Sequence, residues 1–211
     1  SSGFVDDSKF HTEGVSAIPS MKLVVTQVDV YLRWMGLQVN MAKSQITAFD
    51  FATKRMVATD SVTLNGVPFA VLPPHEAHKL LGVRVTLTGN FSLEKEHVLT
   101  SMTNRITALV SDKVLSPVLK ELALKLGVVS IFRYSAGIVP WSKTELDGIS
   151  SMWVAAFKAA WSLSSKQDGS PMSLGLKEGG RACPSATEVW IRAVLDVLDQ
   201  SVSLPGEISR I

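Results

Sequence analysis

The spacing of apolar residues changes at about residue 91, and this change constrains the fold more than any other feature of the sequence. After it, apolar residues recur every three or four positions, as at Val98, Leu99, Met102, Ile106, Leu109 and Val110. Before it, they gather in short segments at 44–51, 61–66, 67–72 and 79–87. The first pattern indicates amphipathic helices and the second indicates short strands. The sequence therefore predicts an α+β chain, with a mixed region followed by a helical region.

The helical region is predicted to hold four helices and one long loop. We expect the helices over 94–112, 117–127, 143–163 and 186–200, and the loop, rich in Ser, Gly and Pro, over 164–185. Within the third helix, Trp153, Phe157 and Trp161 share one helical face. Aromatic residues at that spacing favour core packing over base stacking.

The mixed region is predicted to contain one helix among its strands. Val24, Val25, Val28, Leu32 and Met35 fall on one face of a helix over 21–35, and Gly36 is its expected stop. Asn65-Gly66 predicts a tight hairpin, because both residues tolerate the positive φ of a primed turn. A shorter hairpin is expected at the start of the chain, with Asp6 and Asp7 at its tip.

Composition narrows the class of protein. The chain has 211 residues, 46% of them hydrophobic, which is enough for one sizeable core or two small ones. Its net charge of +2 permits contact with a polyanion without requiring it. A single cysteine, Cys183, excludes a disulfide framework and is expected to be a small buried or half-buried residue. No apolar run approaches the length of a bilayer span, so no membrane partner is expected.

Three motifs follow one another in the mixed region: FVDD at 4–7, GLQVNMAKS at 36–44 and HKLLGV at 78–83. This ordered series resembles the later part of a reverse transcriptase palm, especially of the non-LTR (LINE-type) retrotransposon enzymes. Those enzymes carry Phe/Tyr-x-Asp-Asp in a hairpin, a Gly-Leu-x-x-Asn-x-x-Lys-Ser/Thr segment and a Tyr-Lys-Tyr-Leu-Gly-Val/Ile-like strand pair before a helical thumb. The segment EGGRACPSATEVW at 178–190 resembles the Gly-Gly segment beyond that thumb.

The resemblance implies a division of the chain. Residues 1–91 would be a partial polymerase palm, from the catalytic hairpin to the primer-grip strands, 92–163 a thumb-like helical region, and 164–211 a loop and C-terminal helix. His78 and Leu80 depart from the aromatic residues usual in the family, and Val5 replaces the Ala of many LINE-type enzymes. Because the fingers and an upstream catalytic Asp would precede residue 1, we expect this chain to be part of a longer protein.

Asp6 and Asp7 are the candidate metal ligands. The resemblance implies that Asp6 binds Mg²⁺ directly, with Mn²⁺ as an alternative, and that Asp7 is a neighbouring carboxylate of the same site. Two Mg²⁺ ions roughly 4 Å apart stabilise both the attacking and the leaving oxygen in nucleotidyl transfer. From the residues alone, two adjacent acids could equally be turn formers that bind nearby backbone amides.

Lys43 has two interpretations. It could be a solvated loop residue, or, by resemblance, a catalytic residue that reaches the triphosphate and either neutralises its charge, the favoured role, or protonates the leaving pyrophosphate. Asn40, three residues earlier, is expected to fix the turn through a local backbone bond.

The candidate nucleic-acid contacts lie in the HKLLGVRV segment and in the helix that follows. Gly82 allows another backbone to approach closely, and the resemblance implies that the main chain around Leu81 and Gly82 grips the primer. A glycine at a bend in a sheet remains the alternative. Basic side chains expected to contact phosphates are Lys79, Arg84, Lys95 and Arg105.

The function implied by the resemblance is RNA-directed DNA synthesis. The partners would be an RNA template, a DNA primer and deoxynucleoside triphosphates, inside the cell and in the nucleus for a eukaryotic retrotransposon. The chain alone would be inactive without the upstream palm and fingers. The alternative is a non-catalytic, nucleic-acid-binding or structural relic that keeps the palm as a scaffold. The sequence leaves the oligomeric state open.

Overall fold

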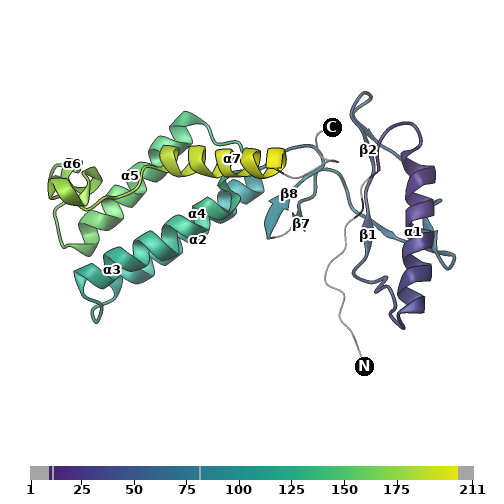
Figure 1. Cartoon of the computed structure of the whole chain (residues 1–211), viewed down its shortest axis with the longest axis horizontal. Coiled ribbons are helices and arrows are strands. Elements are labelled where there is room, and N and C mark those ends of the chain that lie inside the picture. The colour runs from purple at the N-terminus through teal and green to yellow at the C-terminus, as the bar shows by residue number, and fades with distance from the viewer. Residues whose placement is uncertain (1–9, 11, 81, 204–211) are drawn as a thin grey trace. The chain divides into compact units, whose positions relative to one another are not determined.

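The computed structural model describes residues 10, 12–80 and 82–203 (Figure 1). This part of the chain combines helices with small two-stranded sheets, so the coarse α+β prediction is confirmed. It forms two compact units: a sheet unit, made of the residues up to 78 with 85–90, and a helical unit, made of 79–84 and the chain from 91 onward. None of the described helices has the length and apolar composition needed to cross a membrane.

The sheet unit begins with α1 (Ala17–Trp34), which packs against β4 (Thr63–Leu64). Gly36 ends this helix as predicted: its φ is +75°, and the Leu37 N–H donates to the Leu32 carbonyl at 2.8 Å. The helix starts several residues before the predicted position because Pro19 fits in its first turn, where no intrahelical N–H bond is lost. None of the residues of α1 is fully buried within the described chain, and Met35, predicted on its inner face, is exposed.

The predicted strands are present only as short pairs. The Asn65-Gly66 turn joins two of them as expected, with φ of +52° and +77°. The expected strand over 44–51 is interrupted, and it ends where the Asp50 carboxylate accepts the Ala52 N–H at 2.8 Å and starts a turn. The pairs are β1 (Gln45–Ile46) parallel to β6 (Ala70–Val71), β2 (Phe49–Asp50) antiparallel to β3 (Arg55–Met56), β4 antiparallel to β5 (Val67–Pro68), and β7 (His78–Leu80) with β8 (Val83–Val85).

The helical unit packs its long helices lengthwise against one another (Figure 1). The helix α2 contacts both α4 and α5, while α7 contacts the same two helices. The elements are α2 (Ser92–Ser111), α3 (Pro117–Ala123), a π-helical turn (Leu124–Val128), α4 (Val129–Ala136), α5 (Lys143–Ala160), α6 (Ser170–Ser173), a 3₁₀ turn (Leu176–Glu178) and α7 (Ala186–Ser203).

Two predictions for the helical region were wrong in extent. The second helix was expected to end at Gly127, but it continues through the π-helical turn into α4. Val128 and Phe132 are fully buried there, and their burial outweighs the roughly 1 kcal/mol that a glycine costs inside a helix. The segment 164–185, expected to be a loop, contains α6 and the 3₁₀ turn, and Pro171 lies at the start of α6, where proline is favoured.

Aromatic side chains form the centre of the helical unit. The Trp153 and Phe132 rings meet edge to face with centroids 5.6 Å apart, and Phe157 is buried beside them on α5. The prediction of core packing is thus confirmed for Trp153 and Phe157. Trp161 is only half-buried: its indole N–H donates to the Glu121 carboxylate at 2.8 Å.

The segment after α5 is held to the helical unit by polar contacts and by the burial of Cys183. The Arg181 guanidinium stacks 3.6 Å from the Trp161 ring centroid, and Lys125 donates to the Arg181 carbonyl at 2.6 Å. Cys183 is buried as predicted, and burial raises the pKa of its thiol to about 12.

Candidate nucleic-acid interface

Three of the predicted site residues, Asp6, Asp7 and Leu81, lie outside the described residues. The predicted metal site and the Leu81 main-chain contact therefore stay predictions. Among the residues that the structure describes, no group of three or more His, Cys, Asp or Glu side chains could hold a metal ion.

Lys43 lies in the turn that follows α1, and its side chain is exposed. The Asn40 carbonyl fixes this turn, because it accepts the Lys43 N–H at 3.0 Å and the Ser44 hydroxyl at 2.9 Å. Both bonds are made by the main-chain carbonyl of Asn40, so the expected local bond of its side chain stays a prediction. The Lys43 ammonium is thus presented on an ordered turn, as a phosphate contact would require.

Gly82 lies in the turn between β7 and β8, with a φ of +91°. A Cβ atom at this position would lie 2.8 Å from the Tyr134 hydroxyl oxygen and 3.0 Å from Tyr134 Cε1. The sequence predicted close approach of another backbone to Gly82, but the group that approaches is a side chain, the Tyr134 ring on α4. Positive φ and the neighbouring ring therefore both require glycine here.

Arg84, in β8, is bound to a buried carboxylate. Glu94, on α2, is only 3% exposed. Its Oε2 accepts the Arg84 backbone N–H at 2.8 Å. The same oxygen lies 3.6 Å from Arg84 Nη1. A buried carboxylate requires such partners, so the first role of Arg84 is to neutralise Glu94.

Lys95, on the first turn of α2, is also engaged within the helical unit. Its ammonium donates to both carboxylate oxygens of Glu145, each at 2.9 Å, and lies 5.3 Å from the Trp141 ring centroid. Burial alone would raise the pKa of Glu145. Hydrogen bonds from the Ser142 backbone N–H and the Lys95 ammonium outweigh this effect and lower the pKa to about 2. Lys95 thus joins the start of α2 to the start of α5.

Glu145 has a second role at the same place. Its carboxylate accepts the Ser142 backbone N–H at 2.7 Å, while the Ser142 hydroxyl accepts the Glu145 N–H at 3.3 Å. This reciprocal pair is a capping box at the start of α5. The ion pair with Lys95 is therefore built on a fixed helix terminus.

Lys79 and Arg105 are the exposed members of the predicted basic set, and Lys113 beyond α2 is exposed as well. Arg105 lies ten residues after Lys95 on α2, which is about 15 Å along the helix axis. The two predicted basic residues of α2, Lys95 and Arg105, are therefore well separated along that helix.

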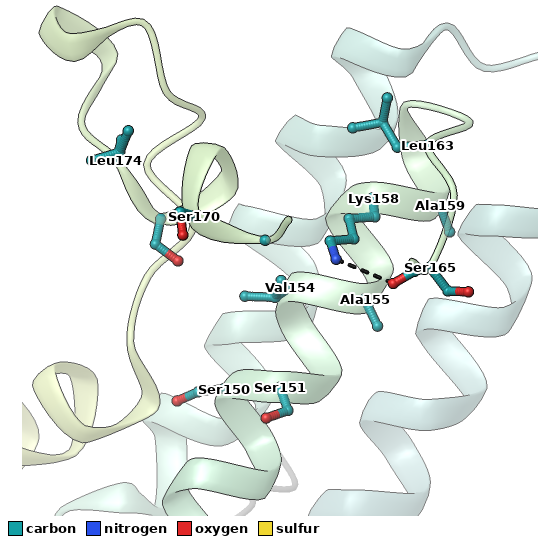
Figure 2. A pocket seen from close by; sticks show the side chains of 12 residues that line it. Ser150, Ser151, Val154, Ala155, Lys158, Ala159, Leu163, Ser165, Ser170 and Leu174 are labelled. Atoms are coloured by element: carbon teal, nitrogen blue, oxygen red, sulfur yellow. Dashed lines mark hydrogen bonds between the residues drawn. The ribbon is translucent and has the colours of Figure 1, made fainter. Parts of the chain in front are cut away.

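A separate groove of about 700 Å³ lies between α5 and the segment 163–174 (Figure 2). Figure 2 shows Lys158 directed at the Ser165 carbonyl, to which it donates at 3.4 Å, and it also donates to the Gln167 carbonyl. The other lining side chains on α5 are small or apolar, such as Val154 and Ala155. This groove contains none of the predicted site residues.

Sequence reasoning missed Glu94, Glu145 and Tyr134. Glu94 could have been found, because it lies four and eight residues before Val98 and Met102 and therefore shares their buried face. A carboxylate on that face signals a buried partner. Tyr134 is far from Gly82 in sequence, and no local pattern joins them.

Comparison of the sequence with protein-family models and with curated proteins gives no match. The function is therefore inferred from the residues of the chain itself.

Proposed function

We propose that this chain is the later palm and the thumb of an RNA-directed DNA polymerase of the non-LTR retrotransposon type. The observation that carries the proposal is the ordered series of FVDD at 4–7, GLQVNMAKS at 36–44 and HKLLGV at 78–83. The elements that separate the motifs support it: α1 lies between the first two, and the helical unit follows the third.

In the proposed reaction, a primer hydroxyl attacks the α-phosphorus of a deoxynucleoside triphosphate and pyrophosphate leaves. Mg²⁺ bound by Asp6 and Asp7 would supply charge stabilisation for the attacking and leaving oxygens. Lys43, exposed on its ordered turn, is suited to contact the triphosphate. A further catalytic carboxylate would then come from the upstream strand of the palm, which the resemblance places before residue 1.

The remaining candidates divide into contact residues and positioning residues. Lys79 and Arg105 are exposed and suit phosphate contacts, which hold a duplex without reading its sequence. Arg84 and Lys95 are bound to Glu94 and Glu145, so we assign them to holding the hairpin turn and the start of α2 in place.

The metal assignment is tested by primer extension. The chain alone should show no extension, because it supplies only part of the carboxylate set. In a protein that restores the upstream palm and fingers, Asp6→Asn should abolish extension, whereas the exposed Asp60→Asn serves as the matched control and should retain it. Extension at the unaltered rate by the Asp6→Asn protein would contradict the metal role of Asp6.

The nucleic-acid role of the helical unit is tested by titrating the chain with an RNA–DNA hybrid. Because the basic residues proposed to contact phosphates are few, binding should be weak and should fall steeply between low and moderate salt. Arg105→Ala should weaken binding for all sequences alike, since a phosphate contact carries no base information. Binding that does not change with salt, or no binding at low salt, would contradict this role and leave the helical unit as a packing support.

The two tests also separate the enzyme from the relic. A protein with restored upstream segments that binds the hybrid but extends no primer would be a non-catalytic nucleic-acid-binding protein.

A further inference from the structure

The segment 82–84, which leaves the turn after β7 and enters β8, contacts two helices of the helical unit. Gly82 lies against the Tyr134 ring on α4, and the Arg84 N–H is bound by Glu94 on α2, while Val83 between them is 2% exposed. This segment is therefore anchored to both α2 and α4.

Tyr134 differs from the other residues of this contact, because the residue is 64% exposed although its ring lies against Gly82. Its neighbours on α4, Phe132 and Ser135, are buried in the core and cannot reach solvent. An exposed aromatic ring adds little to core stability, since most of its surface stays in water. The contact of Tyr134 with Gly82 instead limits where the backbone of the turn can lie.

We propose that Tyr134 is a positioning residue for the primer terminus and that it acts through Gly82. This inference rests on the proposed function, in which the main chain around Gly82 grips the primer. Main-chain groups have no rotamers, so they place a ligand only as accurately as their own backbone is held. The Tyr134 ring provides that restraint from α4, and Glu94 provides it from α2.

The restraint is tested first without nucleic acid, by hydrogen exchange on the whole chain. Tyr134→Ala should raise the exchange rate of the Arg84 amide about tenfold, because the turn opens more often without the ring. Tyr134→Phe keeps the ring and should exchange like the unaltered chain. Tyr31→Ala removes the other tyrosine of the chain, which is similarly exposed on α1, and should leave this amide unchanged.

The functional part is tested with an RNA–DNA hybrid that carries a fluorescent adenine analogue at the primer terminus or, as a reference, at an internal position. With the unaltered chain, binding should change the terminal signal. With Tyr134→Ala, the affinity should stay within about twofold while most of the terminal change is lost and the internal signal is kept. Tyr134→Phe should restore the terminal change.

The outcomes distinguish the inference from the function on which it rests. No hybrid binding by the unaltered chain would overturn the nucleic-acid role of the helical unit and the primer role together, while the polymerase proposal itself is decided by the primer-extension test. Normal binding with an unchanged terminal signal in Tyr134→Ala would overturn the positioning role alone. A Tyr134→Phe chain that behaves like Tyr134→Ala would overturn ring packing on Gly82 as the cause.

Discussion

The helical unit and the sheet unit differ most in how they bury their large side chains. In the helical unit, Trp153, Phe132 and Phe157 are each at most 1% exposed. In the described part of the sheet unit, the buried aliphatic residues are Val62, Leu64 and Leu72, while α1 keeps Val30 and Trp34 exposed. The helical unit has an aromatic core, and the sheet unit has a small aliphatic one.

This difference follows from where each kind of element finds its hydrogen-bond partners. Helices satisfy their backbone within one segment, so α2, α4, α5 and α7 need only pack their apolar faces together. A strand needs a second strand, and an isolated two-stranded pair is only marginally stable in water. The four short pairs in the described part of the chain therefore give α1 little surface on which to bury its face.

The two units also treat charge differently. In the helical unit, the buried Glu94 forms an ion pair with Arg84, and Lys95 forms an ion pair with Glu145. In the sheet unit, Arg33 pairs with Asp29, four residues away on α1, and its guanidinium also donates to the Asn65 side chain in the turn after β4. The two ion pairs of the helical unit therefore join different elements, whereas the Arg33–Asp29 pair lies within one helix and a hydrogen bond to a neutral side chain joins that helix to the turn.

The largest expected change in the free energy of unfolding comes from replacing one phenylalanine by alanine in each unit. Phe157→Ala should lower the free energy of unfolding of the helical unit by about 3–5 kcal/mol, because it leaves a cavity in a closed core. The matched Phe49→Ala, at a half-buried position in β2, should cost about 1–2 kcal/mol. Denaturant dependence of hydrogen exchange measures the two units separately. Equal losses would show that the sheet unit is as tightly packed as the helical unit.

A smaller effect is expected from adding a methyl group at one positive-φ glycine in each unit. Gly66→Ala should cost about 1–2 kcal/mol, because its φ is +77° but no atom crowds the new Cβ. Gly82→Ala should cost about 2–4 kcal/mol, because the Tyr134 ring adds a steric clash to the same strain.

The double variant isolates that clash. Introduced into Tyr134→Ala, the Gly82→Ala change should cost about as much as Gly66→Ala does in the unaltered chain. Urea unfolding of the single and double variants measures the difference. If Gly82→Ala costs the same with and without the Tyr134 ring, the ring does not restrain the turn.

The smallest effect expected is the acid dependence that Glu145 gives to the helical unit. Its pKa is about 2 in the folded chain and 4.5 without the fold, so its stabilising contribution is present above about pH 4.5 and is lost as pH falls toward 2. Glu145→Gln should make the thermal midpoint of the helical unit less sensitive to pH over this range. Asp50→Asn is the sheet-unit counterpart, since hydrogen bonds from Thr53 and Ala52 lower the pKa of Asp50 as well. Identical acid profiles for Glu145→Gln and the unaltered chain would remove Glu145 as the cause.

The sequence predicted features that depend on residues close together in the chain. Gly36 ended α1, Asn65-Gly66 formed its turn, and the apolar face of α2 carried its buried Val98 and Met102. These outcomes follow from φ preferences and from helical periodicity, which are local properties. The buried state of Cys183 was also predictable, from its residue type.

Tertiary structure decided which groups the predicted site residues contact. Arg84 and Lys95 were predicted as phosphate contacts, but carboxylates from other elements bind both. Tertiary burial also carried the second helix past Gly127, because the surface that Val128 and Phe132 remove from water outweighs the helix preference of one glycine. The Tyr134 contact with Gly82 joins residues more than fifty positions apart. Sequence periodicity shows which face of a helix is apolar, but only the packed chain determines which residue meets that face.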